Sequence, residues 1–374
     1  MTDIAPYRHA LTDLWRTNLG VQNGERVLIV TDTEALRSSG HPFGSRHTVA
    51  ELARECALSL GAQATVVAYT AAGAHGTEPP LMLWQASFGP GLERVDPAAL
   101  AAVIAKQADA ATQQRLQAQI AECTRPQYDV LLALSKYSIS HTRFRNWLSA
   151  LHGTRAATMP GFEPGLLTGV MRANWHSIDQ RSSAVARLLT QASSARLISH
   201  YKGETLTLHL DLHGREGHAD GGLITARSDF GNLPGGEAFT APVEGKAEGS
   251  FAAYAADGRN LMRLDVRAGL FAGTDSPGDS YIAPLVEGAA RDARIANLAE
   301  LGVGTNDAAT DTTSVLEGEK ILGTCHIAFG DNHGFGGTVT APFHRDFIVP
   351  APELWLTIAG REQLIVSSGQ HLLP

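Results

Sequence analysis

The first half of the chain alternates between two hydrophobic periodicities. Five segments have the apolar spacing of amphipathic helices: residues 7–19, 47–60, 97–123, 143–151 and 177–190. Short apolar runs lie between the earlier helices, at residues 26–31 (RVLIVT), 64–69 (ATVVAY) and 129–134 (DVLLAL). Such runs are typical of parallel strands that are buried on both faces, and parallel neighbours need crossover helices between them. The pattern therefore predicts a doubly wound α/β domain.

The hydrophobic pattern changes after residue 190. Residues 205–212 (TLTLHLDL) carry leucine at every second position, which is the period of a half-buried strand in an antiparallel sheet. Residues 288–299 look helical, and further strands are predicted at residues 238–243, 249–254, 263–267, 323–329, 343–349 and 353–358. We therefore expect an α/β domain over residues 1–194 and an α+β domain with a mostly antiparallel sheet over residues 195–374, with the boundary near Ser194.

Length and charge narrow the possible functions. A chain of 374 residues can bury two separate cores. The net charge is −8, and the basic residues are scattered, so the basic stripe that a nucleic acid needs is missing. The N-terminus lacks a basic run followed by an apolar segment, and no stretch is apolar for long enough to cross a bilayer. We expect a cytoplasmic protein that binds neither nucleic acid nor membrane.

Cysteine and glycine patterns exclude several kinds of site. Cys56, Cys123 and Cys325 are widely separated and form no CxxC pair, so neither a disulfide framework nor a thiolate zinc site is expected. The glycine-rich residues 214–222 and 330–337 lack both the Walker pattern and the GxGxxG pattern of nucleotide-binding loops. A Gly-x-Ser-x-Gly nucleophile motif is also absent. Any metal would be held by nitrogen and oxygen atoms, and metal chemistry is the strongest hypothesis.

The clearest candidate metal ligands are His344 and Asp346. Alternate residues of a strand point to the same side, so this imidazole and this carboxylate share one face while Arg345 points away. The pair could bind one ion from a rigid strand. Taken alone, a His-x-Asp pair is more often part of a solvated face or a structural hydrogen bond.

Three further candidates lie upstream of this pair. His326 interrupts an apolar strand, where a backbone carbonyl could equally satisfy its imidazole. Glu300 follows the helix-like residues 288–299 and could serve as a cap or face solvent. Glu237 follows two glycines and could lie in an exposed turn. In isolation, each of these residues is compatible with a purely structural role.

Four segments resemble the M29 family of thermophilic-type metalloaminopeptidases. Residues 230–244 (FGNLPGGEAFTAPVE) resemble its Pro-x-Gly-Glu-Val-Phe-Thr-Ala-Pro segment. Residues 299–306 (AELGVGTN) resemble its second glutamate segment, and residues 318–330 (GEKILGTCHIAFG) resemble its histidine segment. Residues 344–346 (HRD) resemble its terminal His-x-Asp. The segments occur in the same order, and the resemblance covers about the C-terminal half of the chain.

This resemblance implies a pair of divalent metal ions, zinc, cobalt or manganese. Their ligands would be Glu237, Glu300, His326, His344 and Asp346. Five such ligands are too many for one catalytic ion that keeps an open position, and they suit two ions that share a bridging carboxylate and a water. The implied activity is hydrolysis of an amide bond next to a free α-amine. We expect a homodimer that acts on a small peptide or an amino-acid-derived substrate, and we count Glu300 among the catalytic residues.

The sequence departs from the family at His333. The family has a tyrosine seven residues after the histidine that corresponds to His326, and this tyrosine is thought to stabilise the tetrahedral intermediate. We expect His333 to replace it as a catalytic hydrogen-bond donor, although a histidine there could also bind metal or be an exposed residue of the glycine-rich loop. The loop between His326 and His344 is also shorter than in typical members of the family. Glu244 and Glu319 lie in the matching segments, where each could support a ligand or be structural.

Two other functions remain open. Ring-cleaving dioxygenases of 2,5-dihydroxypyridine resemble this chain and use one Fe(II) with two histidines and an aspartate, but Glu300 stands where the other histidine is expected, so His326 or His333 would have to substitute for it. A noncatalytic metal- or ligand-binding relative is the third possibility. In every case we expect no metal ligand from the N-terminal domain, whose histidines, such as His41, His47 and His75, lack partner carboxylates at ligand spacing.

Overall fold

The computed structural model describes residues 3–37, 40–71 and 73–372, and the chain divides into two compact units. Unit 1 is formed by Met1–Arg172 and Gly222–Pro234, and unit 2 by Ala173–Gly221 and Gly235–Pro374. The division differs from the boundary expected near Ser194. Helix α8 (Trp175–Gln191) packs against strands β7 (His218–Asp220) and β9 (Glu237–Thr240), which places it in unit 2. Residues 222–234 return to unit 1 after unit 2 has begun. Such a return leaves no signal in the hydrophobic periodicity of the sequence.

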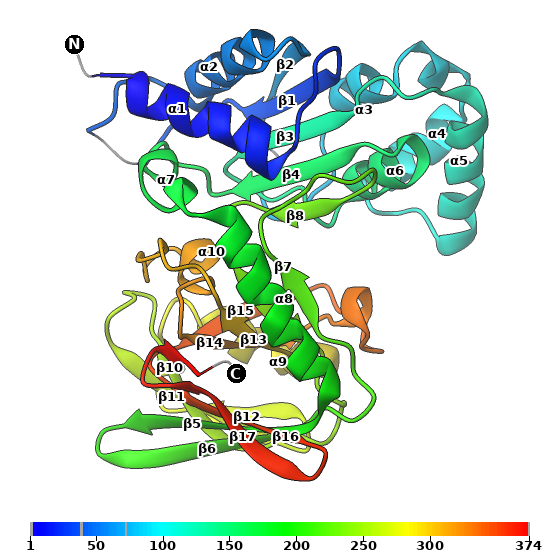
Figure 1. Ribbon diagram of the computed structural model, residues 1–374. Helices are drawn as coiled ribbons and strands as arrows, with labels where there is room; N and C mark the ends of the chain where they lie inside the picture. The colour runs from blue at the N-terminus through cyan, green and yellow to red at the C-terminus, as the bar shows by residue number, and fades with distance from the viewer. Residues whose placement is uncertain (1–2, 38–39, 72, 373–374) are drawn as a thin grey trace. The chain divides into compact units, whose positions relative to one another are not determined.

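Unit 1 contains a five-stranded sheet in the order β2-β1-β3-β4-β8, with every neighbouring pair parallel (Figure 1). Its strands are β1 (Arg26–Asp32), β2 (Gln63–Tyr69), β3 (Val130–Ser135), β4 (Arg155–Pro160) and β8 (Phe230–Asn232). Its α-helices are α1 (Ala5–Asp13), α2 (Arg46–Ser59), α3 (Leu81–Phe88), α4 (Pro97–Ile104), α5 (Ala110–Cys123), α6 (Arg143–His152) and α7 (Gly165–Thr168).

The central strands of this sheet are buried on both faces. Leu28 and Leu131 belong to an apolar cluster with Trp84 of α3 and Phe144 of α6, whereas Ile29 points to the other side and is also fully buried. Helix α2 packs on β1 and β2. These observations confirm the predicted α/β region with a parallel sheet. The predicted helix over residues 97–123 is instead two helices, and Asp109 caps the second of them by accepting a hydrogen bond from the Thr112 amide.

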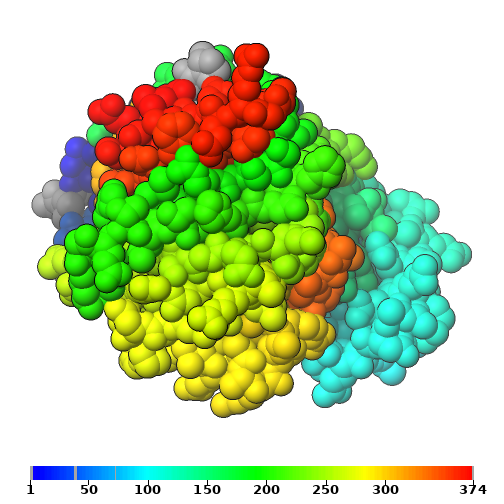
Figure 2. Space-filling view, turned by 90° about the horizontal axis from the view of Figure 1, so that it is seen from below, coloured from blue at the N-terminus to red at the C-terminus, as the bar shows by residue number. Residues whose placement is uncertain are grey.

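Unit 2 contains two largely antiparallel sheets. The larger has the order β12-β11-β10-β6-β5-β16-β17-β18 and the smaller the order β15-β14-β13-β9-β7. In Figure 2, strands β16 to β18 (red), β5 and β6 (green), and β10 to β12 (yellow) follow one another across one face in this order. The larger sheet comprises β5 (Ala192–Tyr201), β6 (Glu204–Asp211), β10 (Glu248–Tyr254), β11 (Leu261–Arg267), β12 (Leu270–Thr274), β16 (Glu353–Ile358), β17 (Arg361–Ser367) and β18 (Gln370–His371). The smaller adds β13 (Leu298–Gly304), β14 (Cys325–Gly330) and β15 (His344–Val349) to β7 and β9.

One apolar core lies against both sheets of unit 2. Leu208 of β6, Phe251 of β10, Ile327 of β14 and Phe347 of β15 belong to it and are fully buried, as is Leu189 of α8. The period-2 pattern predicted for residues 205–212 is confirmed, since Leu206, Leu208 and Leu210 are buried and His209 is exposed. Strands β9, β13, β14 and β15 each turn one face to this core, which leaves the opposite face for polar side chains.

The prediction of a helix over residues 288–299 was wrong. Helix α9 (Ala283–Ala289) and a short 3-10 turn (Ala293–Ala296) precede strand β13, which contains Glu300. All residues of β13 are buried, so its sequence Leu-Ala-Glu-Leu-Gly-Val-Gly shows no alternation that would identify a strand. Glu300 is therefore a strand residue and not a helix cap. No α-helix in the described part of the chain has the length and apolar character that a membrane crossing requires.

Candidate metal centre

Four adjacent strands of the smaller sheet carry the five predicted ligands. These are Glu237 on β9, Glu300 on β13, His326 on β14, and His344 and Asp346 on β15. Their sequence neighbours Leu301, Ile327 and Phe347 are fully buried in the core. Because alternate strand residues point to opposite sides, the five polar side chains share the face that is turned away from the core. A rigid sheet thus gathers residues that are up to 109 positions apart in sequence (346 − 237).

Glu237, Glu300 and His326 form the first of two ligand groups. Their ligand atoms lie within 4.8 Å of one another. The His326 Nε2 atom lies 3.3 Å from Glu237 Oε2 and 3.2 Å from Glu300 Oε1. All three residues are buried, and the other ring nitrogen, Nδ1, has no partner in the described structure. The imidazole therefore presents Nε2 to two carboxylates in the buried interior of the unit.

Glu300, His344 and Asp346 form the second group. The His344 Nε2 atom lies 3.4 Å from Glu300 Oε2 and 3.7 Å from Asp346 Oδ1. The His344 Nδ1 atom lies 2.8 Å from the carbonyl oxygen of Asp331, which can only accept a hydrogen bond. Nδ1 therefore carries a proton, and this contact orients Nε2 toward the carboxylates, as a carbonyl often does for a metal-binding histidine.

Glu300 belongs to both groups. Its Oε1 atom faces His326 and its Oε2 atom faces His344, so each carboxylate oxygen points to a different imidazole. Glu300 could therefore contribute one oxygen to each of two ions. Carboxylate oxygen and imidazole nitrogen are donors that zinc, cobalt and manganese accept. The residues present therefore fit a pair of divalent ions.

Gly302 makes room for the His326 ring. The two residues face each other across the β13–β14 pairing, and a Cβ atom built on Gly302 would lie 1.9 Å from His326 Nε2. Any side chain at this position would occupy the space of the imidazole. Sequence analysis did not single out Gly302, although its place two residues after Glu300 on the same strand face would have been a signal.

Lys320 is a second residue of the site that the sequence patterns did not indicate. It follows the short helix α10 (Val315–Gly318) and is fully buried. Its Nζ atom lies 2.5 Å from Glu237 Oε1 and 2.8 Å from Glu319 Oε1. Burial alone would lower the pKa of Lys320, but the two carboxylates outweigh burial and raise this pKa above its usual range. An ammonium group thus contacts one of the predicted metal ligands.

The carboxylates of the centre differ in their acidity. Burial would raise the pKa of Glu237, but the Lys320 ammonium and the His326 imidazole lower it to about 2. The imidazoles likewise lower the pKa of Glu300 and of Asp346 against the effect of burial. Burial dominates at Glu319 and raises its pKa to about 8, despite the adjacent ammonium. Glu319 is therefore the least acidic carboxyl group of this cluster.

Metal affinity should increase with pH. Burial would lower the pKa of His326 and of His344, but the surrounding carboxylates raise both values well above their usual range. A metal ion needs the deprotonated imidazole, so binding must displace these protons and becomes easier as the pH approaches the raised pKa values. Calorimetric titration of metal-free protein with Zn²⁺, in buffers of different ionisation enthalpy, should detect proton release. An affinity that is constant between about pH 6 and about pH 8 would contradict this expectation.

The loop after β14 approaches the centre through Phe335 and not through His333. His333 begins a 3-10 turn (His333–Phe335), is exposed, and belongs to neither ligand group of the described residues. The Phe335 ring centroid lies 6.0 Å from that of His344 and 5.5 Å from that of Phe239. Phe239 shares the strand face of Glu237 and also contacts His218. An aromatic wall therefore borders the centre.

The remaining candidates have other partners. Glu244 forms an ion pair with Arg215 and accepts hydrogen bonds from the Asn332 side chain and the Thr338 amide, so it holds the loop over residues 332–338. In unit 1, His47 lies 3.9 Å from Glu51 in an exposed pair. Among the described residues, neither ligand group includes His41, His47 or His75.

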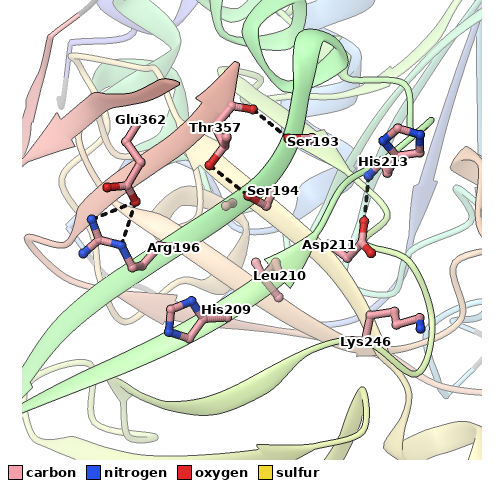
Figure 3. Close-up of a pocket in the computed structure, with 11 residues that line it drawn as sticks. Ser193, Ser194, Arg196, His209, Leu210, Asp211, His213, Lys246, Thr357 and Glu362 are labelled. Atoms are coloured by element: carbon pink, nitrogen blue, oxygen red, sulfur yellow. Dashed lines mark hydrogen bonds and ion pairs between the residues drawn. The ribbon is translucent and has the colours of Figure 1, made fainter. Parts of the chain in front are cut away.

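A hollow lies on the larger sheet, and it is separate from these ligands. Its volume is about 540 Å³, and residues of β5, β6 and β16 line it (Figure 3). Arg196 and Glu362 form an ion pair at 3.0 Å on one side, and Lys246 lies on another. None of the five predicted ligands contributes to it. The hollow is therefore separate from the candidate metal centre.

Comparison with known proteins identifies the fold. No family model matches the chain, and no curated protein sequence does. The structure is similar to that of 2,5-dihydroxypyridine dioxygenase from Pseudomonas putida KT2440, with a TM-score of 0.68 and 18% identity over 100% of this chain and 99% of that chain. It is also similar to wild-type AmpT from Thermus thermophilus, an M29 aminopeptidase, with a TM-score of 0.58 and 16% identity over 98% and 99% of the two chains.

These likenesses show a shared two-domain fold that combines an α/β region with antiparallel sheets. Both neighbours are enzymes, but they catalyse different reactions. The fold alone does not choose between hydrolysis and ring cleavage. The choice depends on the side chains of the centre.

Proposed function

We propose that this protein is a metal-dependent hydrolase of the aminopeptidase type. The observation that carries the proposal is the position of Glu300, whose two oxygens face two imidazoles in two overlapping ligand groups. Two divalent ions bound there would acidify a shared water and polarise the carbonyl of an amide. The substrate would be a small peptide or an amino-acid derivative with a free α-amine.

The ligand residues would have different roles, because their side chains differ in burial. The His326 side chain is 1% exposed, whereas that of His344 is 33% exposed and that of Asp346 is 18% exposed. A substrate can therefore reach the second ligand group more easily than the first. Glu237 and His326 would anchor one ion in the interior, and Glu300 would keep the spacing of the pair. His344 and Asp346 would hold the ion that meets the substrate.

Ring cleavage by a single Fe(II) is the second candidate, and the similarity to the dioxygenase over the full chain favours it. A usual facial triad needs two histidines and one carboxylate around one ion. The group that contains His344 has one histidine and two carboxylates, and His326 belongs to the other group. The donor set therefore supports the hydrolase better.

Metal content measured together with activity tests the proposal. Purified protein should contain about two zinc, cobalt or manganese ions per chain and should hydrolyse aminoacyl-4-nitroanilides. Blocking the α-amine of the same compounds by acetylation provides the matched control and should prevent hydrolysis. About one iron per chain, with oxygen consumption in the presence of 2,5-dihydroxypyridine, would instead establish the dioxygenase.

Replacement of His333 by alanine tests its expected role as an oxyanion donor. If His333 donates a hydrogen bond to the developing oxyanion, turnover should fall by roughly two to three powers of ten at unchanged metal content, and His333→Tyr should recover part of the loss. Turnover and bound metal must be measured on the same preparation. Unchanged turnover would identify an exposed loop residue, consistent with its exposure in this structure. Loss of metal would instead make His333 a ligand.

A further inference from the structure

Lys320 places a buried positive charge beside one ligand group. Its ammonium lies 2.5 Å from Glu237 Oε1, and its side chain is 1% exposed. Glu319, the other partner, lies at 2.8 Å and is also buried. Burial keeps the charge from being screened by solvent and salt. A positive charge fixed at this point repels any cation that the neighbouring Glu237 carboxylate binds.

The two oxygens of Glu237 therefore have different partners. Oε1 contacts the Lys320 ammonium, and Oε2 lies 3.3 Å from His326 Nε2 in the first ligand group. An oxygen held by an ammonium is a poor metal ligand, because the ion and the ammonium repel each other. Glu237 can thus offer one oxygen, and its negative charge is already largely balanced.

The second group has no such cation among its described contacts. The Asp346 carboxylate pairs with His344, and the Tyr281 hydroxyl donates its hydrogen bond to the backbone carbonyl of Asp346 and not to the side chain. His344 is held by the Asp331 carbonyl. The negative charge of this group is therefore available to a bound ion.

We propose that Lys320 makes the two metal positions unequal. The position formed by Glu300, His344 and Asp346 fills first and tightly, and the position formed by Glu237, Glu300 and His326 binds its ion weakly and exchanges it. The active, doubly loaded state then depends on the free metal concentration. This inference rests on the proposed function, because it needs two metal positions.

The test compares metal binding by the full-length protein and its Lys320→Met variant. Metal-free protein is titrated with Mn²⁺, and free Mn²⁺ is followed by electron paramagnetic resonance. The natural chain should show two affinities that differ by about tenfold or more, because the repulsion between a buried unit charge and a divalent ion a few ångströms away exceeds the free energy of a tenfold change in affinity. In Lys320→Met the weaker affinity should rise by about tenfold or more, while the tighter one changes little.

Two controls keep the result interpretable. Lys246→Met removes an exposed lysine of the same unit and should leave both affinities unchanged. Because Lys320→Met also leaves Glu319 without its ammonium, the double variant Lys320→Met, Glu319→Gln replaces both partners of that contact. The double variant should show the same gain of affinity, and it takes the place of the single variant in the test if the single variant does not fold.

The outcomes separate this inference from the proposed function. Two equal affinities in the natural chain, or a weaker second ion in both Lys320 variants, would overturn the role of Lys320 and leave a two-metal centre intact. A single ion in the natural chain and two in Lys320→Met would support the role of Lys320 but overturn the two-metal hydrolase. A single ion in every variant would overturn both.

Discussion

Replacing Asp346 by alanine should abolish turnover and leave the fold intact. The Asp346 carboxylate lies on the polar face of β15, 3.7 Å from His344 Nε2, and contributes nothing to the apolar core. Its backbone pairs with Ala328 and accepts the Tyr281 hydroxyl, and alanine preserves both contacts. Loss of a direct ligand should exceed the roughly 10–100-fold loss that follows removal of a partner outside the coordination sphere. His344→Ala should behave in the same way.

The measurements for this prediction are turnover, bound metal and thermal unfolding on each variant. Asp265→Ala is a matched control, because Asp265 is also a half-buried strand aspartate that pairs with a basic side chain in unit 2. It should retain both turnover and metal. Near-normal turnover of Asp346→Ala at full metal occupancy would remove Asp346 from the centre.

Periodicity predicted those parts of the fold in which burial follows a simple rule. The run over residues 26–31 is buried on almost every side and became β1 of the parallel sheet. The alternating leucines of residues 205–212 became β6, because one face of that strand meets the core. Strand β13 obeys neither rule. It has the core on one face and the candidate metal centre on the other, so Glu300 and Gly302 interrupt the apolar sequence of a fully buried strand.

The candidate ligands came from a resemblance between short segments, and the structure brings all five together on one sheet face. Lys320 could not be found in this way, since it lies in a turn where no period applies and a lysine is usually exposed. Its importance comes from the partners Glu237 and Glu319, and the first of these is 83 positions away (320 − 237). Only the folded chain brings these charges into contact.

Alanine at Gly302 should disable the centre although it replaces none of the candidate ligands. The added Cβ would lie 1.9 Å from His326 Nε2, far closer than real Cβ atoms approach other atoms, so the imidazole must move. His326 is fully buried and its strand is fixed by pairing on both sides, so the ring has little room to adjust. We expect the affinity for one ion to fall by roughly 10–100-fold and turnover to fall with it. The overpacking should also cost about 1–3 kcal/mol of stability.

Gly273→Ala is the matched control for this substitution. Gly273 lies in strand β12 of the same unit, and a Cβ atom there would meet nothing within 4 Å. Both variants insert one methyl group into a strand, so the effect of alanine on the backbone is common to them, and only Gly302→Ala displaces the imidazole. Equilibrium dialysis against Zn²⁺, with calorimetric unfolding of the metal-free proteins, separates ligand displacement from a general loss of stability. If Gly302→Ala bound metal as tightly as Gly273→Ala does, His326 would not coordinate through Nε2, and the first ligand group would have to be abandoned.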